Sequence, residues 1–92
     1  MLAAHRAEAD PIKRDAYIKL ASSALEAAGG KYLARPGRIE ARENGIAQRT
    51  ILIEFESYEA VIAAYESEAY QLALKALDAG ADRDIRLFEG VD

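Results

Sequence analysis

Apolar residues recur along this chain with two spacings, which predict helices and strands in alternation. In residues 12–28 they recur every three or four positions, as on one face of a helix, and Leu20 and Leu25 belong to this series. Gly29 follows directly and is typical of the position after a helix end. Ser57 suits the N-cap of a second helix that reaches about Tyr65. Because Ser67 can cap a further segment, we expect this helix to kink or break near residues 66–67.

Alternation of side chains predicts strands between these helices. Ile51, Ile53 and Phe55 occupy every second position of the clearest one, and Ile85 and Leu87 repeat the pattern near the chain's end. The first strand is assigned from context, since its Leu-Ala-Ala start also allows a helix. The expected strands are residues 2–8, 31–42, 48–56 and 83–89.

The resulting order, β-α-β-β-α-β, is that of a ferredoxin-like α+β fold. We expect one domain over residues 1–92, with a four-stranded antiparallel sheet, strand order 4-1-3-2, and two helices on one face. Alternation places the core between helices and sheet. The expected core residues are Leu20, Leu25, Ile51, Ile53, Phe55, Val61, Leu74, Ile85 and Leu87.

The opposite, helix-free face of the sheet should carry a mixture of apolar and charged side chains. Asn44–Gly45 suggests a two-residue hairpin turn, which would place Arg35 opposite Glu54. A bulge at Pro36–Gly37, or a longer turn, would change this register. Arg86 and Phe88 should point to the same face, with Leu33 and Leu52. A patch of this kind is close to the largest that monomers leave exposed. We therefore expect a homodimer that packs two such faces together about a two-fold axis.

Composition excludes several classes of function. The chain has no cysteine, which rules out disulfides and thiol chemistry and favours a cytoplasmic location. A net charge of −4 with dispersed basic residues argues against nucleic acid as a partner. No apolar run is long enough to span a membrane. With a single histidine, His5, a histidine-rich metal site within one chain is excluded, and we expect no metal or organic cofactor.

Several segments resemble an uncharacterised-domain family numbered 1330, in the dimeric α+β barrel superfamily. The most specific is the Tyr65-x-Ser67-x-x-Tyr70 segment, and the resemblance covers nearly the whole chain. Its other carriers are Ala4–His5, Asp15–Tyr17, Gly29–Arg35, Ile53–Phe55 with Ser57, and Ile85–Val91. The first strand is less β-branched than is usual in that family, and the stretch from Asp10 to Arg14 is longer. The resemblance implies a ferredoxin-like homodimer and no established reaction.

The charged side chains of the sheet are the candidate functional residues. His5 could serve as an acid or base near neutral pH, and Arg35 or Arg86 could hold a carboxylate or an oxyanion. The residues expected to act in catalysis are His5, Arg35 and Glu54. The residues expected to bind ligand are Arg86, Tyr65 and Phe88. The sequence leaves open which face of the first strand carries His5, and the resemblance favours one that faces a pocket.

Each candidate also has a structural interpretation. A lone histidine is more often a hydrogen-bonding residue than a catalyst, and Arg35 with Glu54 is more often a cross-strand ion pair. Two functions therefore compete. One is a small-molecule protein that binds an anionic or carbonyl-containing ligand on the helix-free face, as a cofactor-independent isomerase or oxygenase by analogy with the fold. The other is a non-catalytic homodimer, structural or ligand-sequestering. Whether the protein is an enzyme stays open.

Overall fold

The strands and helices follow the predicted order. The computed structural model describes residues 1–91, and the second helix is divided in two there. The elements are β1 (Leu2–His5), α1 (Pro11–Ala27), β2 (Lys31–Ala34), β3 (Thr50–Glu54), α2 (Tyr58–Glu66), α3 (Glu68–Leu77) and β4 (Arg83–Arg86). All four strands are shorter than the sequence suggested.

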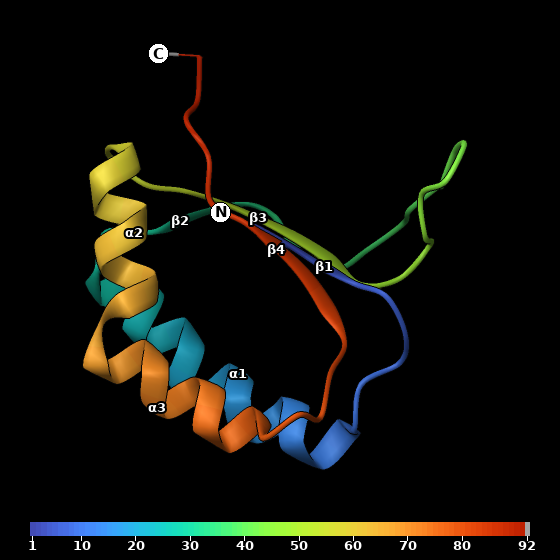
Figure 1. The fold of residues 1–92 in the computed structure, drawn as a ribbon, viewed down its shortest axis with the longest axis horizontal. Coiled ribbons are helices and arrows are strands. Elements are labelled where there is room, and N and C mark those ends of the chain that lie inside the picture. The colour runs from blue at the N-terminus through green and yellow to red at the C-terminus, as the bar shows by residue number, and fades with distance from the viewer. Residues whose placement is uncertain (92) are drawn as a thin grey trace.

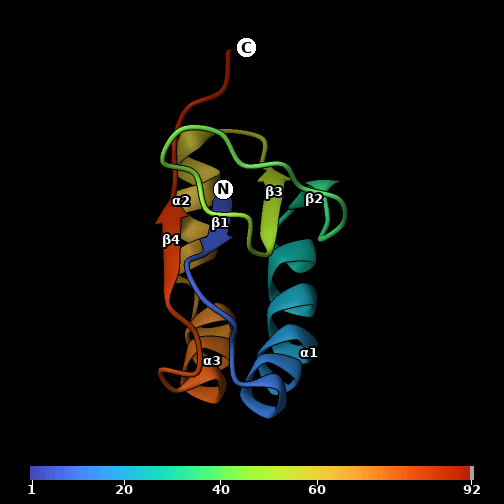
Figure 2. The same ribbon diagram turned by 90° about the vertical axis from the view of Figure 1, so that its right-hand side faces the viewer.

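The four strands form one antiparallel sheet in the order β2-β3-β1-β4, which is the predicted order. All three helices lie on one side of the sheet (Figure 1). Figure 2 looks at the other side, where the sheet carries no helix. None of the helices within residues 1–91 is long and apolar enough to cross a membrane.

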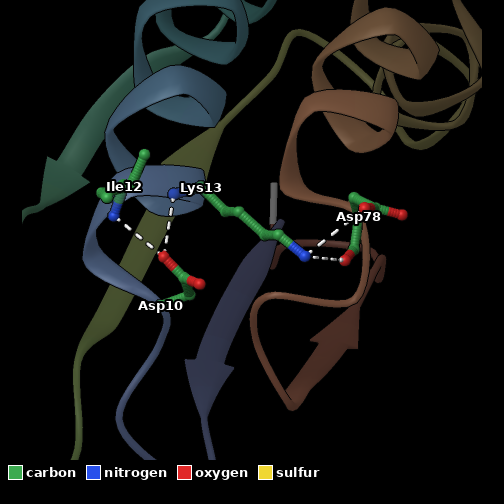
Figure 3. A network of polar contacts seen from close by, with 4 residues as sticks. All are labelled: Asp10, Ile12, Lys13 and Asp78. Atoms are coloured by element: carbon green, nitrogen blue, oxygen red, sulfur yellow. Dashed lines mark hydrogen bonds and ion pairs between the residues drawn. The ribbon is translucent and has the colours of Figure 1, made fainter.

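The start of α1 is fastened to the end of α3 by polar contacts. Asp10 caps α1, because its Oδ1 accepts hydrogen bonds from the backbone N–H groups of Ile12 (3.0 Å) and Lys13 (3.2 Å). The Lys13 ammonium group then reaches across to the carbonyl (3.1 Å) and carboxylate (3.4 Å) of Asp78 (Figure 3). These contacts hold the two longest helices side by side at that end of the molecule.

The break between α2 and α3 falls at Ser67, as predicted. Its hydroxyl donates to the carbonyl of Ala64 at 2.7 Å and accepts from the backbone N–H of Tyr70 at 3.2 Å. One side chain thus provides a hydrogen-bond partner for a free carbonyl in the last turn of α2 and for a free N–H in the first turn of α3. The change of direction brings Tyr70 into the core, where it is fully buried.

Two adjacent glycines between α1 and β2 serve different purposes. Gly29 has a φ of +92°, a conformation that other residues rarely adopt. Gly30 lies so close to the core that an added Cβ would come within 2.8 Å of the Leu25 carbonyl oxygen and 2.9 Å of the Phe55 ring. The sequence predicted the helix end correctly, and the close approach of Gly30 is an additional reason for the pair.

The hydrophobic core lies between the helices and the sheet, largely as predicted. Leu25, Ile53 and Val61 are buried, and the other expected core residues pack against them, with one exception. Leu20 is 46% exposed, so its assignment to the core is wrong. The buried side of α1 carries Ala21, Ala24 and Leu25, and a residue one position before Ala21 is turned about 100° away from it.

Strand β2 ends earlier than predicted, and this changes its register. Tyr32 pairs with Ile53 and Ala34 with Leu52, so one extra β2 residue bulges out between the two pairs. Lys31 is the residue opposite Glu54. The predicted Arg35–Glu54 pair is therefore wrong.

The connection after β2 replaces the predicted hairpin. Residues 35–49 form a long loop that projects from the helix-free side of the sheet (Figures 1 and 2). Pro36 cannot donate a hydrogen bond to a sheet ladder, which is consistent with the strand ending before it. Within the loop, Glu43 has the positive φ of +54°, and the Gly45 N–H donates to the carbonyl of Arg42 at 2.9 Å. The two-residue turn expected at Asn44–Gly45 does not form.

Candidate functional site

A cavity of about 70 Å³ lies between the sheet and α1. Leu25 of α1 and Ile51 and Ile53 of β3 line it, so part of its wall is apolar. Arg35 and Pro36, which are exposed, mark its outer rim at the end of β2. A cavity of this size has room for several waters, or for the head group of a small molecule.

The polar side chains that line this cavity are strongly biased toward positive charge. They come from all four strand regions of the sheet and from α1, and within residues 1–91 none of the lining residues is an aspartate or a glutamate. The basic residues among them are His5, Arg14, Arg35, Arg49 and Arg83. In a chain whose net charge is −4, such a concentration gives the cavity an electrostatic character opposite to that of the whole protein.

His5 occupies the sheet side of the cavity. Along β1, Ala3 and His5 point to the helix-covered face, and Leu2 and Ala4 point to the other face. His5 is only 8% exposed. Its backbone N–H donates to the carbonyl of Arg49 at 2.8 Å. Burial, and then the positive charges of Arg83, Arg49 and Arg14, lower the pKa of His5. The imidazole is therefore neutral at pH 7, with one ring nitrogen able to accept a proton or a hydrogen bond.

Two arginines of the cavity are incompletely balanced by the protein. The Nε atom of Arg14 is buried and has no hydrogen-bond partner within residues 1–91, and its nearest carboxylate oxygen, on Asp15, is 3.7 Å away. Burial, followed by the neighbouring Arg14, lowers the pKa of Arg49. A buried donor without an acceptor and two crowded cations are features that an anionic ligand would relieve.

A hydrogen-bonded group of two tyrosines and an arginine borders the cavity. The hydroxyl oxygens of Tyr17 and Tyr70 are 2.6 Å apart, and Arg83 donates from Nη1 to the Tyr17 hydroxyl at 3.1 Å. The Arg83 guanidinium also lies over the Tyr17 ring, 4.8 Å from its centre. Tyr17 and Arg83 line the cavity, whereas Tyr70 is not among its lining residues and has no exposed surface.

The residues that the sequence suggested as one site are divided among different places. His5 and Arg35 line the cavity beneath α1, where the Arg35 guanidinium stacks on the Tyr32 ring at 4.2 Å. Arg86 is exposed and pairs with Asp84 on the surface of β4, at 3.0 Å. Tyr65 packs against Tyr70, with 5.1 Å between ring centres. The expected convergence of His5, Arg35, Glu54 and Arg86 does not occur.

Glu54 and Phe88 line a second, more open cavity of about 480 Å³ near the end of β3. Leu33 and Leu52 of the helix-free face also border it. Within residues 1–91 its carboxylates are Glu54, Glu56, Glu59 and Glu89, and no Lys, Arg or His side chain of that range lines it. The two cavities thus differ sharply in charge, and an anion is suited only to the first.

Sequence reasoning overlooked Arg14, Tyr17, Arg49 and Arg83 as site residues. For two of them a signal existed. Arg49 lies two positions before Ile51, and Arg83 lies two positions before Ile85. Side chains two positions apart in a strand point to the same face, so alternation places both arginines on the apolar face. A charged residue at that position in a strand is unusual and points to a polar site within the core.

The fold and the cavity together define a ferredoxin-like α+β protein with a basic pocket between its sheet and its first helix. The chain belongs to the DUF1330 family, a domain of unknown function, whose model matches residues 2–91. No curated protein matches the sequence.

Two solved structures are similar over 99% of this chain, each with a TM-score of 0.73. One is described as the crystal structure of methylated RPA0582 protein, with 18% identity and 78% of its own chain covered. The other is the RPA0582 protein of unknown function from Rhodopseudomonas palustris, a structural genomics target, with 19% identity and 80% of its chain covered. At this level of identity the likeness shows the shared fold.

Proposed function

We propose that this protein binds a small organic anion in the basic cavity between β1, β3 and α1. The observation that carries the proposal is the cavity's lining, which combines His5 and four arginines with no carboxylate from the described part of the chain. The unpartnered Nε of Arg14 adds a donor that needs an acceptor. Arginine is suited to bind carboxylates through paired hydrogen bonds, so a carboxylate is the head group that we favour.

The size and the walls of the cavity restrict the ligand further. A volume of about 70 Å³ is well below the ~300 Å³ typical of sites that enclose a drug-sized molecule. The head group would therefore be enclosed, and any larger body would extend through the rim near Arg35 and Pro36. Leu25 and Ile53 would contact the apolar part of the ligand.

His5 makes proton transfer the chemistry that this cavity supports best. A neutral imidazole beside a bound carboxylate could remove a proton from a neighbouring carbon, as general bases do. The activity that follows is a cofactor-independent isomerase. We favour it over an oxygenase because the removal and return of a proton needs only the acid–base group among the lining residues, whereas an oxygenase also needs O₂. A protein that only sequesters the anion would use the same arginines without His5.

We also propose that the protein is a homodimer in which the helix-free faces of two sheets pack together. Leu33 and Phe88, at 53% and 51% exposure, leave an apolar surface on that side. Residues 35–49 project from the same side of the sheet and would reach around a second copy (Figure 1). The basic cavity lies on the opposite, helix-covered side of the sheet, away from the two faces that would pack together. Of its lining residues, Arg35, Pro36 and Arg49 belong to the loop that would reach around the partner.

Titration with small carboxylates tests the anion site. Propionate should stabilise the protein saturably at constant ionic strength, and ammonium or another small cation should not. Arg49→Gln should weaken propionate binding at least about tenfold, because it removes a hydrogen bond between charged groups. The same change should leave the stability of the free protein equal or higher, since Arg14 loses a like-charged neighbour.

Arg42→Gln is the matched control for that experiment. Arg42 lies in the loop of residues 35–49 and pairs with Glu40 at the surface, with 77% of its side chain exposed. Its replacement should alter neither propionate binding nor stability. Equal loss of binding in both variants would point to a general charge effect, and a wild-type protein that binds no carboxylate would refute the proposal.

A further inference from the structure

The direction of the hydrogen bond between Tyr17 and Tyr70 can be deduced from burial. Tyr70 is fully buried, and its hydroxyl contacts the Tyr17 hydroxyl at 2.6 Å. If Tyr17 donated, the Tyr70 O–H would be buried without an acceptor, which is unfavourable. If Tyr70 donates, the Tyr17 oxygen accepts the hydrogen bond, and the buried Tyr70 O–H has its acceptor. Burial, with Tyr17 beside it, also raises the pKa of Tyr70, so that this residue keeps the proton that it donates.

In this arrangement the Tyr17 oxygen accepts two hydrogen bonds and its own proton stays free. Arginine has only donors, so Arg83 donates to Tyr17 at 3.1 Å, and Tyr70 supplies the second hydrogen bond. Hydrogen bonds in such a chain polarise one another and strengthen the next donor. Because Tyr17 lines the basic cavity, its O–H is available to a bound ligand there.

The position of Arg83 indicates which ligand atom would receive this hydrogen bond. Arg83 lines the cavity and contacts the Tyr17 hydroxyl directly. A carboxylate held by Arg83 would therefore lie next to Tyr17, with the adjoining atoms of the ligand facing the phenol. An oxygen on the carbon adjacent to the carboxylate would be suited to accept from it.

We propose that Tyr17 is the directional hydrogen-bond donor of the cavity and selects 2-oxo acids over simple carboxylates. This inference rests on the proposed anion site and narrows its ligand class. Tyr17 donates to the 2-oxo oxygen, Arg83 holds the carboxylate and fixes Tyr17 from one side, and Tyr70 fixes it from behind. The same contact would hold the oxygen of an enolate if His5 removes a proton from the neighbouring carbon.

Pyruvate and propionate form the matched pair of probes, because they share a three-carbon skeleton and differ in the 2-oxo oxygen. Their dissociation constants are measured by calorimetry at one pH and ionic strength, for wild type and for Tyr17→Phe. Wild type should bind pyruvate about three- to tenfold more tightly, the effect of one ordinary hydrogen bond. Tyr17→Phe should bind pyruvate as weakly as propionate, with propionate affinity unchanged.

Two further variants control for folding and for the loss of a phenol elsewhere. Tyr17→Phe leaves the buried Tyr70 hydroxyl without its partner, whereas the double variant Tyr17→Phe/Tyr70→Phe leaves no such orphan and should fold readily. It should show the same loss of selectivity. Tyr58→Phe removes a surface hydroxyl at the start of α2, outside the basic cavity, and should retain the preference for pyruvate.

The outcomes separate this inference from the proposed function. If Tyr17→Phe keeps the preference for pyruvate, or weakens both ligands equally, Tyr17 does not select the 2-oxo oxygen, while anion binding stands. If wild type binds neither probe, both proposals are refuted. The role of Tyr17 is established if Tyr17→Phe and Tyr17→Phe/Tyr70→Phe lose the preference for pyruvate while Tyr58→Phe retains it.

Discussion

At the residue scale, protonation of His5 is unfavourable, because arginines surround its imidazole. His5 is buried on the helix-covered face, and Arg83, Arg49 and Arg14 act on it from β4, from the residue preceding β3 and from α1. These neighbours favour the neutral imidazole, as the lowered pKa of His5 indicates. A bound anion would offset their charge and raise that pKa, so ligand binding and protonation of His5 should be coupled.

This environment predicts a particular dependence of stability on pH. Since the pKa of His5 is lower in the folded protein than the ordinary 6.5, the unfolded chain binds more protons in the interval between the two values. The free energy of unfolding should be highest above about pH 6.5 and fall as the pH drops below it. His5→Gln should remove this part of the decline, as urea midpoints at about pH 7.5 and about pH 5.5 would show.

The comparison between wild type and His5→Gln isolates the histidine. The amino group of Met1 also has a lowered pKa because of burial, and it contributes equally in both proteins. Identical slopes in the two proteins would mean that the imidazole is not held neutral. The addition of propionate should reduce the slope of the wild type, if the anion occupies the cavity.

The sequence could identify His5 as a candidate but could not determine its face. Leu2, Ala3 and Ala4 give no contrast between a polar and an apolar side, so alternation has nothing to distinguish there. The pairing of Ala3 with Ile51 on one side and Ile85 on the other settles it, because both partners belong to the core. The pairing of β1 with its neighbouring strands therefore determines the face of His5, which the four residues of β1 do not determine by themselves.

At the scale of elements, the sequence predicted the orientation of a strand correctly where apolar and polar side chains alternate along it. Ile53 of β3 is 2% exposed and lies beneath the helices, as alternation required. Strand β2 was mispredicted because its ending depends on a bulge and on Pro36, whose effects on register extend to Arg35. The one extra residue of the bulge reverses the faces of the positions that follow it, and Arg35 lies at the rim of the basic cavity. The arginines of that cavity come from elements distant in sequence, which no local pattern links.

Core and surface residues that share one sequence pattern should differ in their contribution to stability. Ile53→Ala should lower the free energy of unfolding by about 2–5 kcal/mol, because it leaves a cavity between the sheet and the helices. Leu20→Ala should cost less than about 1 kcal/mol, since Leu20 is 46% exposed and alanine favours the helix. Urea denaturation of both variants checks this difference, and similar losses would contradict the assignment of their faces.

At the scale of the whole molecule, a chain of 92 residues has limited surface to bury alone. The helices cover one face of the sheet, and the other face keeps Leu33, Leu52 and Phe88 beside a group of carboxylates. A second copy would shield these apolar side chains and add buried area to a small core. Its approach would require the carboxylates to lie at the margin of the contact or to find partners there, since a buried unpaired charge is costly.

Phe88→Glu tests this assembly. The wild-type protein should sediment with twice the 10.0 kDa chain mass at micromolar concentration, and the variant should shift toward the monomer, because the new carboxylate would enter the interface unpaired and near Glu54 and Glu89. Leu72→Glu is the matched control. Leu72 is also 51% exposed, but it lies on α3, on the helix-covered side, so its replacement should leave the mass unchanged. A wild-type monomer would refute the proposed dimer, and equal dissociation of both variants would show that the helix-free face is not the interface.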